Sequence, residues 1–252
     1  MMPPCLQLEG VSRHFGGLRA VDNLTLSVQP GARHAVIGPN GAGKTTLFNV
    51  ISGESPASRG TISLNGANIT KLKAHQRARL GIARTFQITR LFPELTVIDN
   101  VLLACAALDR RKFAMYKPLS SYPEFTERAT SLLEQFGLTS IAHEQARHIS
   151  YGACRRLDVA LALAGRPRLL LLDEPMAGLS TPERVAIRGL LEQLDPSIAV
   201  MLIEHDMDVA FSFAARVTVL HQGKVLADGT RDDVSTNDLV QKAYLGTVGG
   251  RP

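Results

Sequence analysis

A glycine-rich loop carries the residues of this sequence that are best suited to chemistry. Residues 38–45 read Gly-Pro-Asn-Gly-Ala-Gly-Lys-Thr, which matches the pattern GxxxxGK[ST]. Residues 33–37 before the loop predict a short buried strand, and residues 47–52 after it predict a helix that Gly53 ends. In that setting the glycines let successive backbone N–H groups curl around a phosphate chain. The loop therefore predicts binding of a nucleoside triphosphate.

Each part of this loop has an expected contact with the nucleotide. Lys44 is expected to reach the β- and γ-phosphates, and the hydroxyl of Thr45 is expected to ligate Mg²⁺. The N-terminus of the following helix adds the positive end of its dipole. A chance glycine-rich turn is the alternative, and the Lys-Thr pair in register argues against it. A nucleoside triphosphate with Mg²⁺ is therefore expected here, and the family resemblance given below implies that this nucleotide is ATP. The nucleotide-binding residues expected here are Gly38, Asn40, Gly41, Ala42, Gly43, Lys44, Thr45 and Thr46.

Two adjacent carboxylates form a second group of residues suited to chemistry. Asp173 and Glu174 follow residues 169–172, a continuous apolar run that predicts a strand buried on both faces. Open parallel sheets bind their ligands at the carboxyl ends of their strands. Asp173 is expected to hold Mg²⁺ through water, and Glu174 to polarise a water molecule against the γ-phosphate. The alternative is an acidic turn exposed to solvent, which the upstream phosphate loop disfavours.

The segment Ser150-Tyr151-Gly152 precedes a helix that is predicted over residues 153–164. It offers a hydroxyl and a helix N-terminus to an anion. Alone this signal is weak, because serine is an ordinary helix cap. Its position shortly before the acidic strand gives it weight as a second phosphate-binding element.

Taken in chain order, these groups resemble the motifs of the ATP-binding subunits of ABC transporters. The resemblance covers essentially the whole chain, and further segments narrow it to the Liv-type branched-chain amino acid importer ATPases, in the LivG branch. The family resemblance is carried by the phosphate loop, Arg84-Thr85-Phe86-Gln87, Ser150-Tyr151-Gly152, Asp173-Glu174, Gly178-Leu179-Ser180 and His205. The segments that narrow it are residues 83–87, 90–92, 95–97, 203–207 and 242–246.

The resemblance also implies roles for residues whose types alone would not suggest them. Phe15 matches the aromatic residue that stacks on adenine. Gln87 matches the glutamine that touches Mg²⁺ and the attacking water and links the site to the membrane subunit. His205 matches the histidine that contacts the γ-phosphate. Ser150 and Gly152 match the signature motif, which completes the ATP site of the opposite subunit across a dimer.

Two residues depart from the pattern of the family, and both would lie at the dimer interface. Ala153 stands where glutamine is usual, and Ser180 stands where aspartate or asparagine is commoner. Both departures leave the chain's own phosphate loop, acids and histidine intact. They fit a pair of ATP sites with unequal tasks. We therefore expect a heterodimer with a second, related ATPase subunit, with a homodimer as the alternative.

The expected fold class is α/β. The resemblance implies a P-loop NTPase with a RecA-like mixed sheet core, an N-terminal antiparallel β subdomain and an inserted α-helical subdomain. A single nucleotide-binding domain is expected over residues 1–252, with the helical insertion near residues 92–165. The sequence pattern agrees, because strand-like, helical and again strand-like segments follow one another. The expected strands are residues 24–28, 60–66, 198–203, 217–220 and 224–227, and the last two are expected to form a hairpin around the turn at residues 221–223. The expected helices include residues 96–107 and 123–136.

Composition argues against several other classes of protein. The chain has 252 residues, of which 45% are hydrophobic, and its longest apolar runs are far shorter than a membrane-spanning helix. No signal peptide is evident. Three scattered cysteines match neither a disulfide framework nor metal-ligand spacing. The net charge is +5, but short basic clusters such as Arg77, Arg79 and Arg84, with few aromatics and no tryptophan, predict solvated faces and no nucleic-acid partner. Proximity to anionic lipid is the alternative account of these clusters.

The resemblance further implies the setting in which the chain works. It predicts a peripheral protein on the cytoplasmic face of the inner membrane, docked to transmembrane permease subunits and linked indirectly to a periplasmic solute-binding protein. The expected cargo is a small polar solute, with branched-chain or other hydrophobic amino acids favoured. Two alternatives stay open from the residues: a soluble ABC-type ATPase that is not coupled to transport, and a small-molecule kinase that shares only the phosphate loop.

Overall fold

The computed structural model describes residues 3–85, 91–109 and 118–245, and the chain forms two compact units. The first unit contains residues 1–77 and 196–252, and the second contains residues 78–195. The predicted helical insertion, residues 92–165, belongs entirely to the second unit. The expected bounds of a single nucleotide-binding domain stay a prediction.

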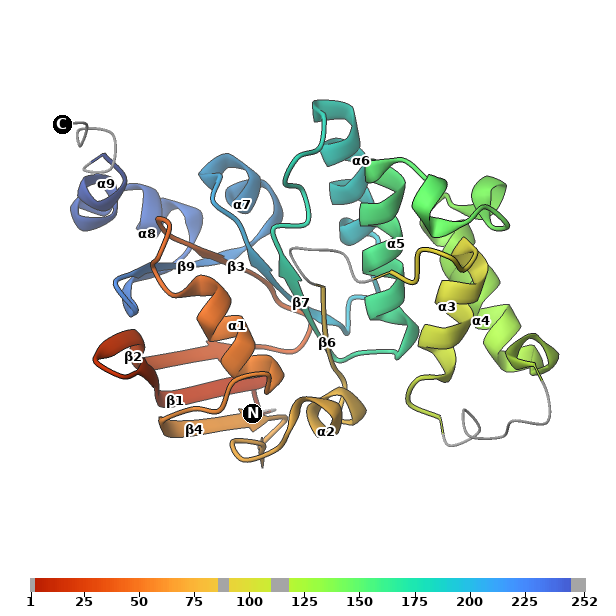
Figure 1. The fold of residues 1–252 in the computed structure, drawn as a ribbon. Helices are drawn as coiled ribbons and strands as arrows, with labels where there is room; N and C mark the ends of the chain where they lie inside the picture. Colours follow the sequence, from red (N-terminus) through yellow and green to blue (C-terminus); the bar gives the residue numbers. More distant parts are fainter. Residues whose placement is uncertain (1–2, 86–90, 110–117, 246–252) are drawn as a thin grey trace. The chain divides into compact units, whose positions relative to one another are not determined.

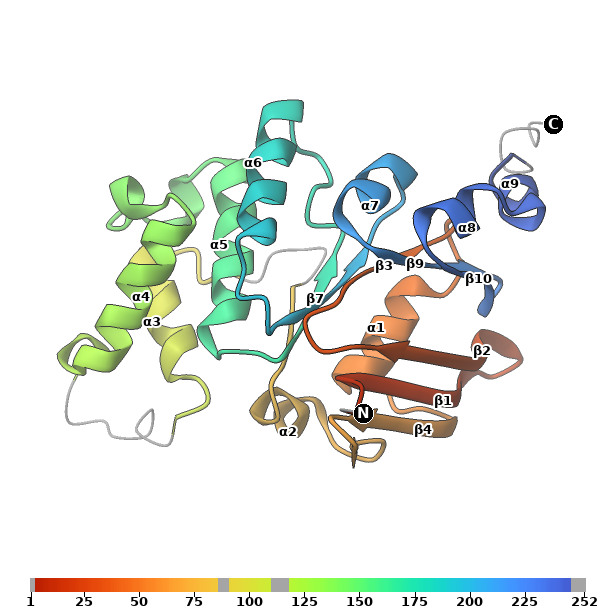
Figure 2. The same ribbon diagram turned by 180° about the vertical axis from the view of Figure 1, so that it is seen from behind.

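An antiparallel sheet of four strands in the order β2-β1-β4-β5 makes up one layer of the first unit (Figures 1 and 2). Alternate residues of β2 are buried in its second half, so Leu24, Leu26 and Val28 point into the core. The strands predicted at residues 24–28 and 60–66 are thereby confirmed. The bounds are β1 Leu6–Phe15, β2 Leu18–Val28, β4 Arg59–Leu64 and β5 Ala67–Asn68.

The first unit also contains four strands of a second sheet, which are hydrogen-bonded in the order β10-β9-β3-β8. The central strand β3 pairs in parallel with both β8 and β9, and β10 pairs antiparallel with β9. Gln222 and Gly223 both have positive φ angles, 49° and 79°, as a two-residue hairpin turn requires. The predicted hairpin is therefore confirmed. The bounds are β3 Arg33–Ile37, β8 Ala199–Ile203, β9 Arg216–His221 and β10 Lys224–Gly229.

In the first unit, the C-terminal end of helix α1 is capped by a buried arginine side chain. Arg77 is fully buried and donates hydrogen bonds to the carbonyls of Val50 and Ile51, in the last turn of α1, and to those of Thr70 and Leu72. The expectation that Arg77 lies on a solvated face was wrong, since its guanidinium satisfies carbonyls that the helix leaves unpaired. The bounds are α1 Lys44–Ser52, α7 Met207–Phe213, α8 Arg231–Ser235 and α9 Asp238–Leu245, and α2 Ala74–Arg79 crosses into the second unit.

The second unit combines two parallel strands with a group of helices. In both views α3, α4 and α5 lie side by side (Figures 1 and 2). Their shared core includes Phe125, Ala129, Leu132 and Leu133 of α4, which recur at helical spacing. The bounds are β6 Ile82–Arg84, α3 Val97–Ala106, α4 Pro123–Gln135, α5 Tyr151–Ala164, β7 Leu169–Asp173 and α6 Thr181–Glu192, with short 3₁₀ turns at Leu119–Ser121, Thr139–Ile141 and Ala146–His148.

Two helices begin earlier than predicted. Helix α1 begins at Lys44 and α5 at Tyr151, two or three residues before the predicted starts. The loop residues Gly43 and Ser150 act as N-caps, so the phosphate-binding motifs are themselves the helix starts. Within the described ranges, no helix is both long and apolar enough to cross a bilayer.

Candidate nucleotide-binding site

The phosphate loop connects β3 to α1, and its three predicted glycines are required for different reasons. Gly38, Gly41 and Gly43 have φ angles of 150°, 78° and 103°. A Cβ at Gly38 would lie 2.2 Å from the Leu220 carbonyl oxygen, and one at Gly43 would lie 2.2 Å from the Ala20 carbonyl oxygen. A Cβ at Gly41 would have no neighbour within 4 Å. Gly38 and Gly43 therefore allow close backbone packing, whereas Gly41 faces open space, where a ligand fits.

The start of α1 presents donors toward this open space. Lys44 is buried, and its Nζ donates to the carbonyl oxygens of Gly38 at 2.7 Å and Pro39 at 3.1 Å. The backbone N–H groups of Thr45 and Thr46 have no acceptor among the described residues. Helix α1 has neither a capping side chain nor an acidic residue in its first turn. This helix start therefore suits an anion, and the exposed Thr45 hydroxyl lies beside it.

Backbone hydrogen bonds hold the loop against the hairpin turn of the same unit. The N–H of Gly223 donates to the Ala42 carbonyl at 2.9 Å, and the N–H of Asp22 donates to the Gly223 carbonyl at 2.8 Å. Ala42 is buried, whereas Asn40 beside it is exposed. The loop is thus fixed in position by main-chain contacts, with Asn40 free to face a ligand.

His205 reaches the same edge of the sheet as the phosphate loop. Val36 of β3 pairs in parallel with Ile203 of β8, so Gly38 and His205 each follow by two residues. The N–H of Glu204 donates to the Val36 carbonyl at 3.3 Å, which extends the pairing to the strand end. The side chain of His205 is 59% exposed. The parallel register therefore places His205 at the loop end of the sheet, as its predicted contact with the γ-phosphate requires.

Phe15 ends β1 as an exposed aromatic side chain, with 48% of its surface accessible. The guanidinium of Arg13 lies 4.4 Å from the centre of its ring. A core position for Phe15 is excluded by this exposure. One ring face already carries a cation–π contact, and an exposed ring of this kind suits stacking on a base.

The metal-binding carboxylate predicted in the second unit is held by a buried ion pair. Arg84 Nη2 donates to Asp173 Oδ2 at 2.9 Å, and both side chains are less than 10% exposed. Strands β6 and β7 pair in parallel, with Arg84 opposite Leu171. The hydroxyl of Thr85 accepts from the N–H of Asp173 at 3.2 Å. Sequence reasoning missed this role of Arg84 and placed it on a solvated face; the parallel register brings it to the acid instead.

Glu174 follows Asp173 in an unusual backbone conformation. Its φ angle is 48°, in the left-handed region that side-chain-bearing residues seldom adopt, and its carbonyl accepts from the N–H of Ala177 at 3.1 Å. Such conformations cost about 1–3 kcal/mol and gather at functional sites. The left-handed turn begins directly after the buried Asp173, at the residue predicted to act as the base.

Each unit holds an oxygen of the kind that suits a magnesium ion bound together with nucleotide. In the second unit, Asp173 uses Oδ2 for Arg84 and keeps Oδ1 as an oxygen ligand. In the first unit, the exposed Thr45 carries a hydroxyl. Mg²⁺ in such sites is held by one or two protein oxygens, substrate phosphates and water. In keeping with this, the described residues contain no group of three or more His, Cys, Asp or Glu suited to a metal. Gln87, the third predicted ligand, lies outside the described residues.

The signature segment forms the N-terminus of α5 in the second unit. The hydroxyl of Ser150 accepts from the N–H of Ala153 at 3.2 Å and is exposed. Gly152 is buried against Glu183, since a Cβ there would lie 2.3 Å from Glu183 Oε1. A cavity of about 290 Å³ lies beside this contact and is lined by Ser150, Gly152, Ala153, Arg156, Pro182, Glu183, Ala186 and Ile187.

Tyr151 and Ser180 have structural roles that sequence reasoning missed. The hydroxyl of Tyr151 donates to the Ala177 carbonyl at 3.1 Å and accepts from Arg155 Nη2 at 2.7 Å, so it ties α5 to the loop after Glu174. Ser180 caps α6 in a reciprocal arrangement with Glu183, and these hydrogen bonds lower the pKa of the Glu183 carboxyl. A serine three residues before a glutamate was the available signal for that cap.

The comparisons with known proteins show which family the chain belongs to. The ABC transporter family matches residues 21–177. The chain is 40% identical to BraF of Pseudomonas aeruginosa and 39% identical to LivG of Escherichia coli strain K12, each a high-affinity branched-chain amino acid transport ATP-binding protein. Each alignment covers 98% of this chain and 99% of the relative.

Solved structures give the same result for the fold. The ADP conformation of an ATP-binding cassette from an ABC transporter has a TM-score of 0.86 at 29% identity, covering 96% of this chain and 99% of that one. A dimeric cassette in a post-hydrolysis state with ADP and phosphate has a TM-score of 0.77 at 25% identity, covering 90% and 98%. The predicted α/β fold of a P-loop NTPase is confirmed. The chain therefore belongs to the ABC transporter family, as an ATP-binding and ATP-hydrolysing subunit.

Proposed function

We propose that this chain powers the import of branched-chain or similar apolar amino acids through a membrane permease. The observation that carries the proposal is its identity of 39–40%, over nearly its full length, to two proteins named for transport of these amino acids. Those relatives favour the importer ATPase over a soluble ABC-type ATPase. The shared phosphate loop alone would also fit a kinase, but a kinase needs neither Ser150 nor His205 in this order.

In the proposed reaction the phosphate loop holds the triphosphate, with Phe15 stacked on the adenine. Lys44 exchanges its loop carbonyls for phosphate oxygens, which is a stronger, charge-assisted contact. Thr45, Asp173 and Gln87 would hold Mg²⁺, which would supply positive charge to offset that of the phosphates. Glu174 accepts the proton of the attacking water, and His205 contacts the γ-phosphate.

A complete site requires a second ATPase subunit. Ser150 and Gly152 present a hydroxyl and a helix N-terminus, which would close over the γ-phosphate bound by the partner. ATP then favours the closed pair, and hydrolysis reopens it, because the nucleotide contacts both subunits only when they are closed. Ala153 and Ser180 belong to this face, and they support a heterodimer with a related chain over a homodimer.

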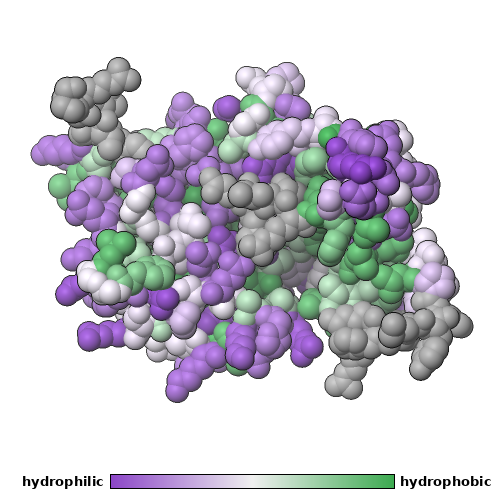
Figure 3. All heavy atoms as spheres, in the orientation of Figure 1, coloured by the Kyte–Doolittle hydropathy of each residue, from purple (hydrophilic) through white to green (hydrophobic). Residues whose placement is uncertain are grey.

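The second unit offers a surface for the permease. Hydrophobic residues gather over α3 in Figure 3, and the exposed apolar side chains of this unit include Phe92 and Leu103. Such patches commonly mark protein contacts. Gln87 and residues 88–94 would lie at that contact, on the cytoplasmic face of the inner membrane. The periplasmic solute-binding protein would act only through the permease.

Uptake of labelled leucine tests this function. Cells that lack the gene should lose high-affinity leucine uptake and regain it with the wild-type gene, but not with Lys44→Ala. Uptake of a sugar serves as the control for membrane energy. Full leucine uptake in the deletion strain, with loss of another solute instead, would overturn the amino acid assignment and leave the ATPase standing.

A further inference from the structure

A cation–π contact in the first unit involves the aromatic ring that is expected to stack on adenine. Arg13 and Phe15 both belong to β1 and are two residues apart. The guanidinium carbon of Arg13 lies over the ring, 4.4 Å from its centre. Phe15 is nevertheless 48% exposed. The ring therefore keeps a wide accessible surface apart from the face that Arg13 covers.

The hairpin that carries this ring packs on the phosphate loop of the same unit. Phe15 pairs with Leu18 across the turn between β1 and β2. Two residues further along β2, the carbonyl oxygen of Ala20 lies so close to Gly43 of the loop that a Cβ on that glycine would be 2.2 Å away. A Cβ at Gly16, in the turn, would meet nothing within 4 Å. The ring thus stands at an open turn beside the loop, a position that suits the base of a nucleotide whose phosphates the loop holds.

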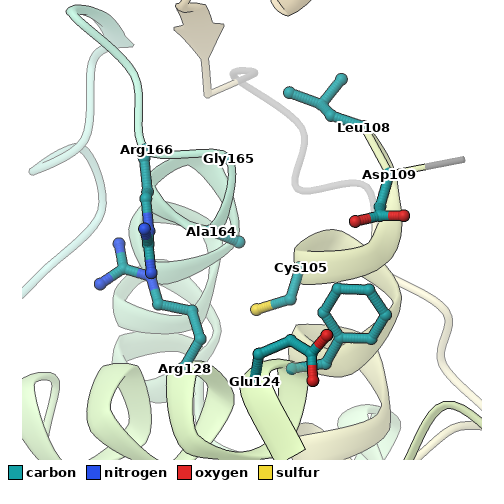
Figure 4. A pocket seen from close by; sticks show the side chains of 9 residues that line it. Cys105, Leu108, Asp109, Glu124, Arg128, Ala164, Gly165 and Arg166 are labelled. Atoms are coloured by element: carbon teal, nitrogen blue, oxygen red, sulfur yellow. The ribbon is translucent and has the colours of Figure 1, made fainter. Parts of the chain in front are cut away.

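The guanidinium of Arg13 is held differently from those of other arginines that are not fully exposed. Arg84 donates to a carboxylate at 2.9 Å. Arg128, which lines the cavity shown in Figure 4, donates to a main-chain carbonyl at 2.9 Å. Among the described residues, Arg13 has neither a hydrogen-bond acceptor nor a carboxylate at ion-pair distance, although its Nε atom is buried. The ring of Phe15 is therefore the contact that fixes the position of this cation.

A cation on one face of an aromatic ring affects stacking on the opposite face in two ways. It restricts the ring to one rotamer, so the side chain has less freedom to lose when a base binds. It also draws π-electron density toward itself, because the faces of the ring carry the negative part of the quadrupole. The opposite face becomes less negative, which reduces its repulsion of the π electrons of a purine that lies flat on it. Both effects strengthen the stacking of a base on the ring.

We propose that Arg13 is a positioning residue for the adenine of bound ATP and acts through the ring of Phe15. The order of the stack is guanidinium, phenyl ring and base, and Arg13 does not touch the nucleotide. This inference rests on the proposed stacking of Phe15 on adenine. It assigns part of the affinity for the base to a residue outside the phosphate loop. A cation that reached the phosphates instead would strengthen the binding of a bare polyphosphate as much as that of ATP.

Titration of the full chain with ATP, read by displacement of an ATP analogue labelled on its ribose, tests the proposal. Arg13→Met removes the charge but keeps the length of the side chain, and should weaken ATP binding about 2- to 5-fold, the scale of an exposed cation–π contact. Arg13→Lys keeps a cation near the ring and should bind ATP more tightly than Arg13→Met. Arg59→Met, at an exposed position of β4 in the same sheet, is the matched control and should bind as wild type. Equal affinities of wild type and Arg13→Met would overturn the proposal.

A double-mutant cycle separates an effect through the ring from a general effect of charge. Phe15→Ala should weaken ATP binding about 10-fold, within the range for one base stacked on an aromatic side chain. In the Phe15→Ala background, Arg13→Met should cause no further loss, because no ring remains to transmit its effect. Equal losses from Arg13→Met in both backgrounds would overturn the proposal. Unchanged ATP affinity in Phe15→Ala would overturn the proposed stacking and this inference with it, whereas a loss in Phe15→Ala alone would overturn only the role of Arg13.

A ligand without a base gives an independent readout. Inorganic tripolyphosphate with Mg²⁺, measured by displacement of the labelled ATP analogue, should bind Arg13→Met as tightly as it binds wild type. Steady-state hydrolysis should show a raised KM for ATP and an unchanged kcat, because the base is bound equally before and during phosphoryl transfer. Equal losses for ATP and tripolyphosphate would show that Arg13 acts on the phosphates or on the fold, and would overturn the positioning role. A lowered kcat with an unchanged KM would overturn it as well.

Discussion

The two units hold their functional groups by different means. In the first unit, backbone geometry positions the phosphate loop: positive φ angles, close contacts of glycine with carbonyls, and parallel strand register. In the second unit, side chains position side chains, as in Arg84 on Asp173, Arg155 on Tyr151 and Ser180 with Glu183. A site whose shape depends on backbone conformation tolerates few residue types at those positions. A site positioned by contacts between side chains can change when both contacting residues are substituted together. The family departures at Ala153 and Ser180 both fall in the second unit.

Replacing Glu174, the base that we propose for the second unit, should give the largest effect on the reaction. Glu174→Gln keeps the shape of the side chain and the left-handed turn, but amide nitrogen cannot take a proton from water. ATP hydrolysis should fall about 100-fold or more, the scale of general base catalysis, with ATP affinity unchanged. Phosphate release and nucleotide titration measure the two quantities. Wild-type hydrolysis by this variant would exclude Glu174 as the base.

A glycine pair sharpens the claim that backbone geometry fixes the first unit. Gly43→Ala places a methyl group 2.2 Å from the Ala20 carbonyl oxygen, in a left-handed conformation, and should cost about 3 kcal/mol. ATP affinity should fall on the order of 100-fold. Gly66→Ala, in the turn between β4 and β5, is the matched control, since its φ is also positive, at 81°, and its Cβ would meet only Pro3 Cβ at 3.8 Å, so only the φ strain remains. Equal losses in the two variants would contradict the role of close packing.

Arg84→Gln tests the corresponding claim for the second unit. The variant leaves the Asp173 carboxylate buried without its cation, which typically costs about 3–5 kcal/mol. The chain should unfold at lower denaturant, and the loss should shrink in the double variant Arg84→Gln with Asp173→Asn. Denaturation midpoints of Arg84→Gln, Asp173→Asn and the double variant, together with wild type, form a thermodynamic cycle. Additive losses would mean that the ion pair does not hold Asp173.

This difference between the units also decided what could be predicted from the sequence. The glycine loop, the apolar run before Asp173 and the hairpin turn are local patterns, so their structures followed from residue types and spacing. The burial of Arg77 and Arg84 could not be predicted, because their hydrogen-bond partners belong to other elements. A basic cluster in the sequence gives no sign of those partners. Helices α6 and α7 were also missed, although Ser180 with Glu183 and Asp206 signal their N-caps.

The smallest effect expected in the wild-type chain is on the pH dependence of stability, because the contributions of the two units should show opposite trends and offset each other. In the first unit, burial lowers the pKa of His34 to about 4, against the opposing effect of Asp228. The Thr218 hydroxyl donates to Asp228, so it accepts from His34 Nε2, and His34 is neutral. In the second unit, burial raises the pKa of Asp158 to about 7, partly offset by Arg155.

The signs follow from proton uptake in the unfolded and folded states. His34 takes up its proton more readily when unfolded, so its contribution to stability is present above pH 6.5 and is lost as pH falls toward 4. Asp158 keeps its proton more readily when folded, so its contribution is present below pH 3.8 and is lost as pH rises toward 7. Between pH 4 and 6.5 the two contributions therefore oppose each other. His34→Gln should leave stability that falls with rising pH, and Asp158→Asn stability that rises with it, each by up to about 1.4 kcal/mol per pH unit. Urea midpoints from pH 4.5 to 7.5 measure both slopes. Parallel profiles for the two variants and wild type would show that burial shifts the pKa of neither group.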